Sequence, residues 1–206
     1  MRSLVPAVPT VTYRHQAGLP KGLEPEEVRR ILTSCDTTSD NGVRDLAILT
    51  LLVRLGLRRC EVSRLGLDDI DWRAGTICVH GKGNCLERLP LPVDVGHYLA
   101  QYLRHARPAK ARGRTAFVRH FAPYNALSAS RVSTIVADAA RRAGVGRVHA
   151  HRLRHTAATQ LLRAGASLPE VGQVLRHRRA QTTAIYAKVD HDTLRVIARP
   201  WPEDAQ

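Results

Sequence analysis

The amino-acid sequence predicts a mainly α-helical domain with one small antiparallel β-sheet, an α+β fold. Apolar residues recur with the period of a helix in most segments after residue 20. Two β-rich segments, Thr76–His80 and Leu86–Leu91, flank the turn residues Gly81-Lys82-Gly83-Asn84, a pattern typical of a β-hairpin. Hydrophobic residues make up 44% of the 206 residues, which is enough to bury a sizeable core.

Start signals and apolar faces locate the helices. The first begins near Glu24-Pro25-Glu26-Glu27, because a first turn tolerates proline and acidic side chains favour the positive end of the helix dipole. Its apolar face is Val28, Ile31 and Leu32. Other helices are expected at about 43–55, 60–65, 94–105, 128–143, 151–164, 168–175 and 179–187, and 117–118 is a candidate short strand.

The chain divides into three parts. Residues 1–19 are predicted to be a linker or arm, since they carry prolines and no clear periodicity. Residues 20–190 contain the helical and hairpin patterns and form one compact domain, and residues 191–206 are a C-terminal tail. There is no internal repeat and no low-complexity tract.

The composition favours a polyanionic partner. There are 32 Lys and Arg against 18 Asp and Glu, a net charge of +14, and nucleic acid is the leading candidate for such a basic chain. No stretch approaches the roughly 18 apolar residues of a membrane span, and Met1 to Pro9 lacks the apolar core of a signal peptide. The four cysteines have no CxxC spacing. A cytoplasmic, nucleoid-associated protein with reduced thiols and no membrane partner is therefore expected.

Two basic residues lie where the chain turns. Gly56 is a helix stop that leaves Arg58 in a turn before the next helix. Lys82 lies between two glycines of the hairpin, where a lysine can reach a ligand without steric crowding. Each residue alone is typical of a solvated surface. The lysine does not belong to a phosphate-binding P-loop, since the chain lacks that pattern.

A third cluster follows in His149-Ala150-His151-Arg152-Leu153-Arg154-His155. On a helix, His151, Arg154 and His155 share one face. Paired histidines can bind a metal, but fixed cations beside them and no accompanying carboxylate argue against a metal site. A polar face that grips an anion fits better, and a solvated basic face is the remaining alternative.

The last cluster runs from Val174 to Arg179 and continues to Tyr186. With the others it gives the order Arg58, Lys82, His151-x-x-Arg154, His177 and Tyr186. In this order, and in the stretches Gly56-Leu57-Arg58 and His151-Arg152-Leu153-Arg154-His155-Thr156, residues 20–190 closely resemble the tyrosine recombinase, or phage integrase, family. The resemblance implies the catalytic-domain fold of that family for this segment.

The implied activity is site-specific DNA cleavage and rejoining through a 3′-phosphotyrosyl link to Tyr186. The resemblance assigns Arg58, Arg154 and His177 to the phosphate, His151 to proton transfer, and Lys82 to protonation of the leaving 5′-oxygen. These residue types suit the reaction, because arginine forks neutralise the charge that builds on a phosphodiester under attack. A free tyrosine has a pKa near 10, so a basic pocket that lowers the cost of ionising it favours attack. No cofactor and no metal are required.

Supporting roles are expected for other polar residues. Glu61, three residues after Arg58, can orient a neighbouring cation or His151, and His155 has a structural role beside the site. Arg176 replaces the glycine of the family's usual Leu-Gly-His, where it either adds a phosphate contact or crowds the loop. The candidate DNA contacts are Arg131, Arg176, Arg178 and Arg179.

Double-stranded DNA is the expected partner, with a homotetramer assembled on paired sites as the resemblance implies. Family members usually carry a further N-terminal helical domain of about a hundred residues, whereas about 20 residues precede the catalytic region here. One alternative is therefore a DNA-binding remnant or regulator that occupies recombination sites without turnover. A type IB topoisomerase is another, although the nine-residue spacing from His177 to Tyr186 favours a recombinase.

Overall fold

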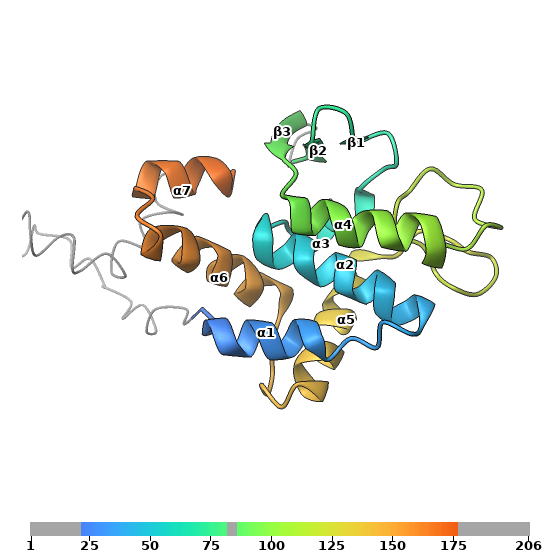
Figure 1. Ribbon diagram of the computed structural model, residues 1–206, viewed down its shortest axis with the longest axis horizontal. Helices are drawn as coiled ribbons and strands as arrows, with labels where there is room; N and C mark the ends of the chain where they lie inside the picture. Colours follow the sequence, from blue (N-terminus) through green and yellow to red (C-terminus); the bar gives the residue numbers. More distant parts are fainter. Residues whose placement is uncertain (1–21, 82–85, 177–206) are drawn as a thin grey trace, which may run out of the picture.

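The computed structural model describes residues 22–81 and 86–176. Within these residues the fold is mainly helical with one three-stranded antiparallel sheet, as the sequence predicts (Figure 1). The helices are α1 (Pro25–Thr33), α2 (Asp40–Arg54), α3 (Arg59–Arg64), α4 (Val93–Gln101), α5 (Ala129–Arg142), α6 (Ala150–Arg163) and α7 (Leu168–Val174). The strands are β1 (Ile70–Asp71), β2 (Thr76–His80) and β3 (Leu86–Pro90).

Helix α2 is the centre of the hydrophobic core. It packs against all the helices from α1 to α6, and Ile48, Leu49, Leu51 and Leu52 on it are fully buried. Its start lies three residues before the predicted one, because Ser39 caps the helix by accepting a hydrogen bond from the backbone N–H of Gly42 at 3.1 Å. The burial of α2 on nearly all sides explains why its apolar residues extend beyond a single stripe.

The sheet follows the predicted hairpin. Strands β2 and β3 pair antiparallel, with Ile77 opposite Leu89 and His80 opposite Leu86. Ile77 and Val79 alternate with less buried neighbours and cover the core. The two-residue strand β1, which no sequence pattern predicts, pairs with β2 on the side opposite β3. The sheet lies beside the start of α4 in Figure 1.

Two other segments differ from the sequence-based expectation. The helix expected at 94–105 is α-helical only to Gln101 and continues as a π-helical segment, η2, over Tyr102–Ala106. Residues 117–118 form no strand, and an isolated bridge joins Val118 to Ala126. The Phe117 ring is buried in the core, where it stacks on Tyr102 with 5.2 Å between the ring centroids. The helix expected at 179–187 lies outside the described residues.

Helix α7 is attached to the rest of the fold by α6. Val171 and Leu175 pack with Ala158 of α6 in a small hydrophobic cluster separate from the main core. In Figure 1, α7 stands at one side of the molecule, above α6. Leu175, just after α7, also approaches Gly56 at the end of α2, and this contact brings the last described turn next to the turn that carries Arg58.

Gly56 is required at that approach. Its φ is +57°, and a Cβ there would lie 2.5 Å from Cδ2 of Leu175. We expect Gly56→Ala to lower the free energy of unfolding by about 2–4 kcal/mol, through backbone strain and overpacking together. Gly144→Ala is the control, since Gly144 has φ +65° but open space around its Cβ position, and it should cost only about 1 kcal/mol. Urea unfolding measures both, and equal losses would show that the contact with Leu175 is unimportant.

Candidate active site

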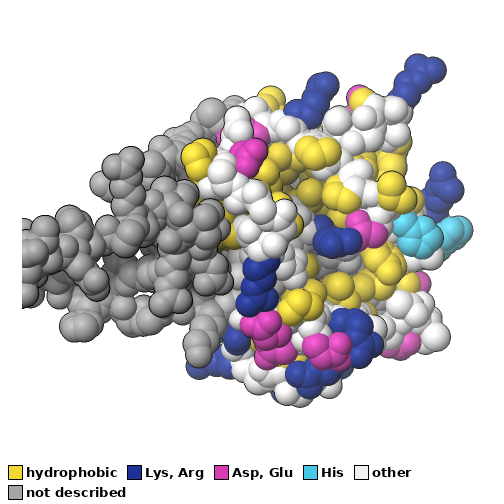
Figure 2. Space-filling view, turned by 60° about the vertical axis from the view of Figure 1, so that its left-hand side comes forward, with side chains coloured by type: hydrophobic (Ala, Val, Ile, Leu, Met, Phe, Trp, Pro, Cys, Tyr) yellow, Lys and Arg dark blue, Asp and Glu magenta, His cyan; other side chains and the backbone are white. Residues whose placement is uncertain are grey.

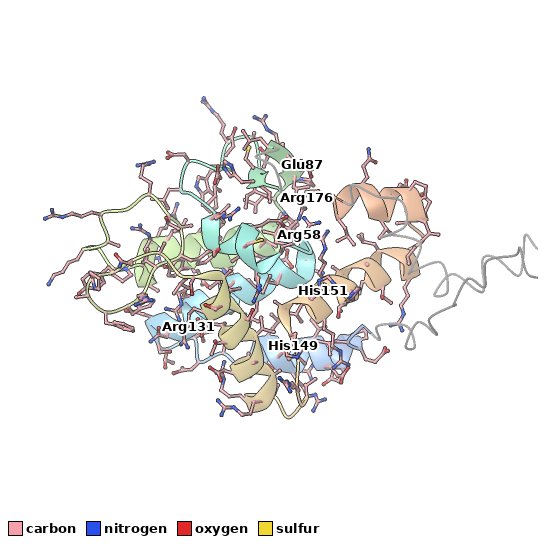
Figure 3. The ribbon with its side chains drawn as sticks, turned by 180° about the vertical axis from the view of Figure 1, so that it is seen from behind. Arg58, Glu87, Arg131, His149, His151 and Arg176 are labelled. Atoms are coloured by element: carbon pink, nitrogen blue, oxygen red, sulfur yellow. The ribbon has the colours of Figure 1, made fainter. Side chains whose placement is uncertain are left out.

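A hollow of about 410 Å³ lies where α3, α5 and the start of α6 meet. It brings together three predicted site residues, Arg58, His151 and Arg154. Four further polar residues line it: Arg59, Cys60, Ser133 and His149. We call this hollow the arginine pocket. Figure 3 labels Arg58 at α3 and His151 on α6, with His149 below them.

Arg58 is fixed at the first turn of α3. It is the N-cap residue of this helix, and its backbone N–H donates to Oε2 of Glu61 at 2.7 Å. Its guanidinium donates from Nη1 to Oε1 of Glu61 at 2.6 Å and from Nη2 to the carbonyl of Arg176 at 3.3 Å. The side chain remains 37% exposed. The turn after Gly56 therefore holds an arginine in a set direction while leaving it accessible to an anion.

Arg154 is held more deeply. The residue is 2% exposed, and its guanidinium donates from Nη1 to the carbonyl of Gly56 at 2.5 Å and from Nη2 to the carbonyl of Leu175. A guanidinium has five N–H donors in a rigid fork, so anchoring on two carbonyls fixes the plane of the whole group. Two arginines from distant parts of the chain, on α6 and before α3, thus line one pocket in fixed orientations.

Glu61 is the buried counter-ion of the pocket. Its side chain is 2% exposed and pairs with Arg58 at 2.6 Å and with Arg176 at 2.7 Å. Burial alone would raise the pKa of this carboxyl, but the charges of Arg176 and Arg58, with the hydrogen bonds from Arg58, outweigh it and lower the pKa. Glu61 is therefore ionised at neutral pH and orients a neighbouring cation, which is the first of the two roles considered for it.

The two histidines of α6 have different surroundings. His151 is exposed at the rim of the arginine pocket, whereas His155 is buried, and their rings meet edge to face with centroids 4.3 Å apart. Burial of part of the His151 ring, and then the charges of Arg154 and Arg58, lower the pKa of His151. His151 is therefore neutral near pH 7, the state in which an imidazole can accept a proton.

His155 makes the fold sensitive to acid. Burial, and then the neighbouring His151 and Arg154, lower the pKa of His155 to about 4. Its value in an unfolded chain is about 6.5, so stability is complete above pH 6.5 and is lost as the pH falls from 6.5 towards 4. We expect His155 alone to reduce the free energy of unfolding by about 2 kcal/mol between pH 7 and pH 5.

Urea unfolding of His155→Gln at the two pH values tests this expectation. The variant should lose less stability on acidification than the parent protein. His105→Gln, which replaces an exposed histidine of η2, is the matched control and should keep the parent pH dependence. An unchanged pH dependence in His155→Gln would mean that the buried imidazole is not the acid-sensitive group.

Arg176, a candidate for a phosphate contact or for crowding its loop, lies in the interior of the described structure. Its side chain is 2% exposed and points inwards, where Nη2 pairs with Glu61, so the guanidinium does not face a DNA backbone in this arrangement. Arg131 is exposed at the first turn of α5 and lines another hollow, of about 600 Å³, with Arg119 and Phe121. Figure 3 shows Arg131 away from Arg58. Lys82, His177, Arg178, Arg179 and Tyr186 lie outside the described residues.

Some pocket residues were not singled out from the sequence. Arg59 donates from Nη1 to Oγ of Ser133 at 3.2 Å, which joins α3 to α5 beside Arg58. His149 is the N-cap residue of α6 and lines the pocket through that position. Arg59 directly follows Arg58, and His149 lies two residues before His151. This closeness in sequence to predicted site residues could have indicated that both line the pocket. No sequence feature indicated Ser133, because only the packing of α5 on α3 brings it to the pocket.

In residues 22–81 and 86–176, no group of three or more His, Cys, Asp and Glu is placed to hold a metal ion. None of the helices in the same ranges has the length and apolar character needed to cross a bilayer.

Comparison with known proteins identifies the family. Residues 21–192 match the model of the phage integrase family. The chain is 47% identical to putative integrase/recombinase y4rA of Sinorhizobium fredii, over 98% of this chain and 50% of y4rA. It is 39% identical to putative integrase/recombinase y4gC of the same organism, over 89% of this chain and 97% of y4gC. It is 34% identical to tyrosine recombinase XerD of Listeria innocua, over 89% of this chain and 63% of XerD. The chain belongs to the phage integrase family, as its resemblance to tyrosine recombinases predicts.

Solved structures confirm the fold. The structure of XerA recombinase superposes with a TM-score of 0.76 over 90% of this chain and 66% of XerA, at 24% identity. That of the site-specific recombinase XerH, bound to a palindromic difH substrate in a post-cleavage complex, gives a TM-score of 0.75 at 26% identity over 90% of this chain and 54% of XerH. The chain thus spans about half the length of y4rA and of XerH.

Proposed function

We propose that residues 20–190 are the catalytic domain of a site-specific DNA recombinase, which cleaves and rejoins strands through a 3′-phosphotyrosyl intermediate. The observation that carries this proposal is the arginine pocket, where Arg58 and Arg154 meet with their guanidinium groups fixed by carbonyls and Glu61. Fixed cations of this kind act on charge that develops in a transition state without first having to reorganise. Family membership supports the same reaction class.

The pocket suits attack on a phosphodiester. Charge builds on the nonbridging oxygens as the nucleophile approaches, and two arginine forks can neutralise it, a role that metal ions fill in many nucleases. His151 stands at the rim as a neutral imidazole and receives the proton of the attacking hydroxyl. The described residues therefore provide charge neutralisation and a base in one place.

Three further roles are proposed on residues outside the described ranges. Tyr186 is the nucleophile, His177 donates a hydrogen bond to the phosphate, and Lys82 protonates the leaving 5′-oxygen. The support for these roles is the order and spacing of the residues in a chain of this family. The covalent link retains the energy of the phosphodiester, so rejoining requires no nucleotide cofactor.

The proposed partner is double-stranded DNA, bound near the nucleoid by a homotetramer on paired sites. The net charge of +14 and the DNA complex of XerH support a DNA partner. Figure 2 shows Lys and Arg side chains interspersed with acidic and hydrophobic ones on the described part of one face.

The test captures the covalent intermediate. The chain is incubated, with EDTA present, with a pool of nicked duplexes whose core is randomised, so that cleavage releases a short fragment and traps the protein on DNA. We expect an adduct that survives denaturing electrophoresis, and sequencing of the trapped strands would give the target. Salt-sensitive DNA binding without any adduct would instead support a DNA-binding regulator. Relaxation of supercoiled DNA without exchange between duplexes would support a topoisomerase.

A further inference from the structure

Arg176 occupies a backbone position that favours glycine. Its φ is +57°, in the left-handed region that an L-residue with a long side chain rarely adopts. Such a conformation costs on the order of 1 kcal/mol for a residue other than glycine. Arg176 directly follows Leu175, the C-cap residue of α7, and most helices that end in this way carry glycine there. An arginine at this position therefore requires a compensating interaction of its side chain.

The side chain of Arg176 makes that interaction with Glu61. Nη2 donates to Oε2 of Glu61 at 2.7 Å, and both side chains are 2% exposed. Nη1 donates to the carbonyl of Val174 at 3.2 Å, and Nε lies 3.6 Å from Oε2 of the more exposed Glu87 on β3. Figure 3 shows Arg176, Arg58 and Glu87 grouped between α7 and the sheet. The guanidinium thus links the turn after α7 to α3, with a longer contact to β3.

The backbone of the same turn holds both arginines of the pocket. The carbonyl of Leu175 accepts a hydrogen bond from Arg154, and the next carbonyl, that of Arg176, accepts one from Arg58 at 3.3 Å. Two consecutive carbonyls therefore orient the two guanidinium groups. Any displacement of this turn would move both catalytic cations together.

The turn needs an anchor of this kind. The hydrophobic cluster that holds α7 consists of contacts with α6, whereas the hydrogen bonds that join Arg176 to Arg58 and Glu61 are polar. Glu61 serves both arginines without competition, since Oε1 accepts from the Arg58 guanidinium and Oε2 from Arg176 and the backbone of Arg58. Arg176 can therefore lock the turn to α3 while leaving the Arg58–Glu61 pair intact.

We infer that Arg176 is a positioning residue of the active site: its ion pair with Glu61 fixes the 175–176 turn, whose carbonyls orient Arg58 and Arg154 towards the reacting phosphate. This inference rests on the proposed recombinase function. It gives Arg176 no contact with DNA. It also accounts for an arginine in a conformation suited to glycine, because a glycine would leave Glu61 with one cation instead of two.

The experiment measures DNA affinity and single-turnover cleavage of the trapped-duplex substrate separately, with the full chain. Arg176→Gln should slow cleavage by about tenfold to a hundredfold, as expected when catalytic groups are displaced by fractions of an ångström. The dissociation constant for DNA and its salt dependence should stay within about twofold, since a lost phosphate contact would instead reduce the salt slope by about one. Arg176→Lys should recover part of the cleavage rate, because the charge opposite Glu61 returns.

Two further variants distinguish the effect of the Arg176–Glu61 ion pair from those of backbone strain and of the contact with Glu87. Arg176→Gly removes backbone strain together with the guanidinium, so slow cleavage in this variant as well would assign the effect to the lost ion pair. Glu87→Gln is the matched control, because it removes the distant, 40% exposed carboxylate, and its rate should be unchanged. In thermal unfolding, Arg176→Gln should lower Tm in the parent protein but much less in Glu61→Gln, where the buried partner carries no charge.

The outcomes distinguish this inference from the proposed function. Cleavage at the parent rate by Arg176→Gln and Arg176→Gly, with an adduct formed by the parent chain, would overturn the positioning role alone. Weaker DNA binding with an unchanged cleavage rate would show that Arg176 contacts the phosphate backbone instead. No adduct from the parent chain would overturn the recombinase function, and the positioning role with it.

Discussion

Tyr186→Phe is expected to abolish the covalent protein–DNA adduct while leaving the protein folded and able to bind DNA. The substitution removes one oxygen atom, the proposed nucleophile, and keeps the aromatic ring. Without that oxygen no phosphotyrosyl bond can form, so the loss should be complete within detection, at least about a thousandfold. Denaturing electrophoresis after incubation with the nicked duplex pool measures the adduct, and a filter-binding or gel-shift titration measures the retained affinity.

Tyr98→Phe provides the matched control for this loss. Tyr98 is a half-buried residue of α4 whose ring meets His97 edge to face. It lines a different hollow from the arginine pocket, and neither Arg58 nor Arg154 lines that hollow. Its variant should form the adduct at the parent rate. An adduct that persists in Tyr186→Phe would show that another residue attacks the phosphate. Its loss in both variants would point to a general effect of removing tyrosine hydroxyls.

Local patterns predicted the fold and the placement of the described pocket residues well. The i, i+3 spacing of His151 and Arg154 predicted a shared helix face, and both residues line one pocket. The helix stop at Gly56 predicted the turn that presents Arg58, and the glycine has the expected positive φ. These predictions succeeded because helix periodicity and turn chemistry depend on residues a few positions apart.

Interactions between distant segments were harder to predict. Arg176 was expected to contact a DNA phosphate or to crowd its loop, because it replaces the glycine of the family's usual Leu-Gly-His next to the site. Its partner, Glu61, lies 115 residues earlier in the chain, and no local pattern shows that the turn after α7 packs against α3. Ser133 reaches the arginine pocket by the same kind of long-range packing. The buried Tyr102, the first residue of η2, likewise makes a long-range contact, because its ring stacks on Phe117.

Arg154→Lys is expected to reduce both catalysis and stability, whereas Arg58→Lys should affect mainly catalysis. Lysine keeps the charge but loses the planar fork, so each variant should cleave about a hundredfold to a thousandfold more slowly. Arg154 is buried and anchored on the carbonyls of Gly56 and Leu175, and its replacement should lower the free energy of unfolding by about 2–4 kcal/mol. Arg58 is 37% exposed, and solvent screening limits its loss to about 1 kcal/mol.

Single-turnover cleavage and urea unfolding of the two variants separate a catalytic from a structural arginine. Arg54→Lys is the control, because Arg54 ends α2 on the surface, paired with Asp94 at 2.6 Å, and it should change neither quantity appreciably. If Arg154→Lys were destabilised and still cleaved at the parent rate, the guanidinium would serve only to join α6 to the turns at Gly56 and Leu175. Slow cleavage in both lysine variants, with a large stability loss only for Arg154→Lys, would show that Arg58 serves the phosphate alone. Arg154 would then act on the phosphate and also hold together the three segments that form the pocket.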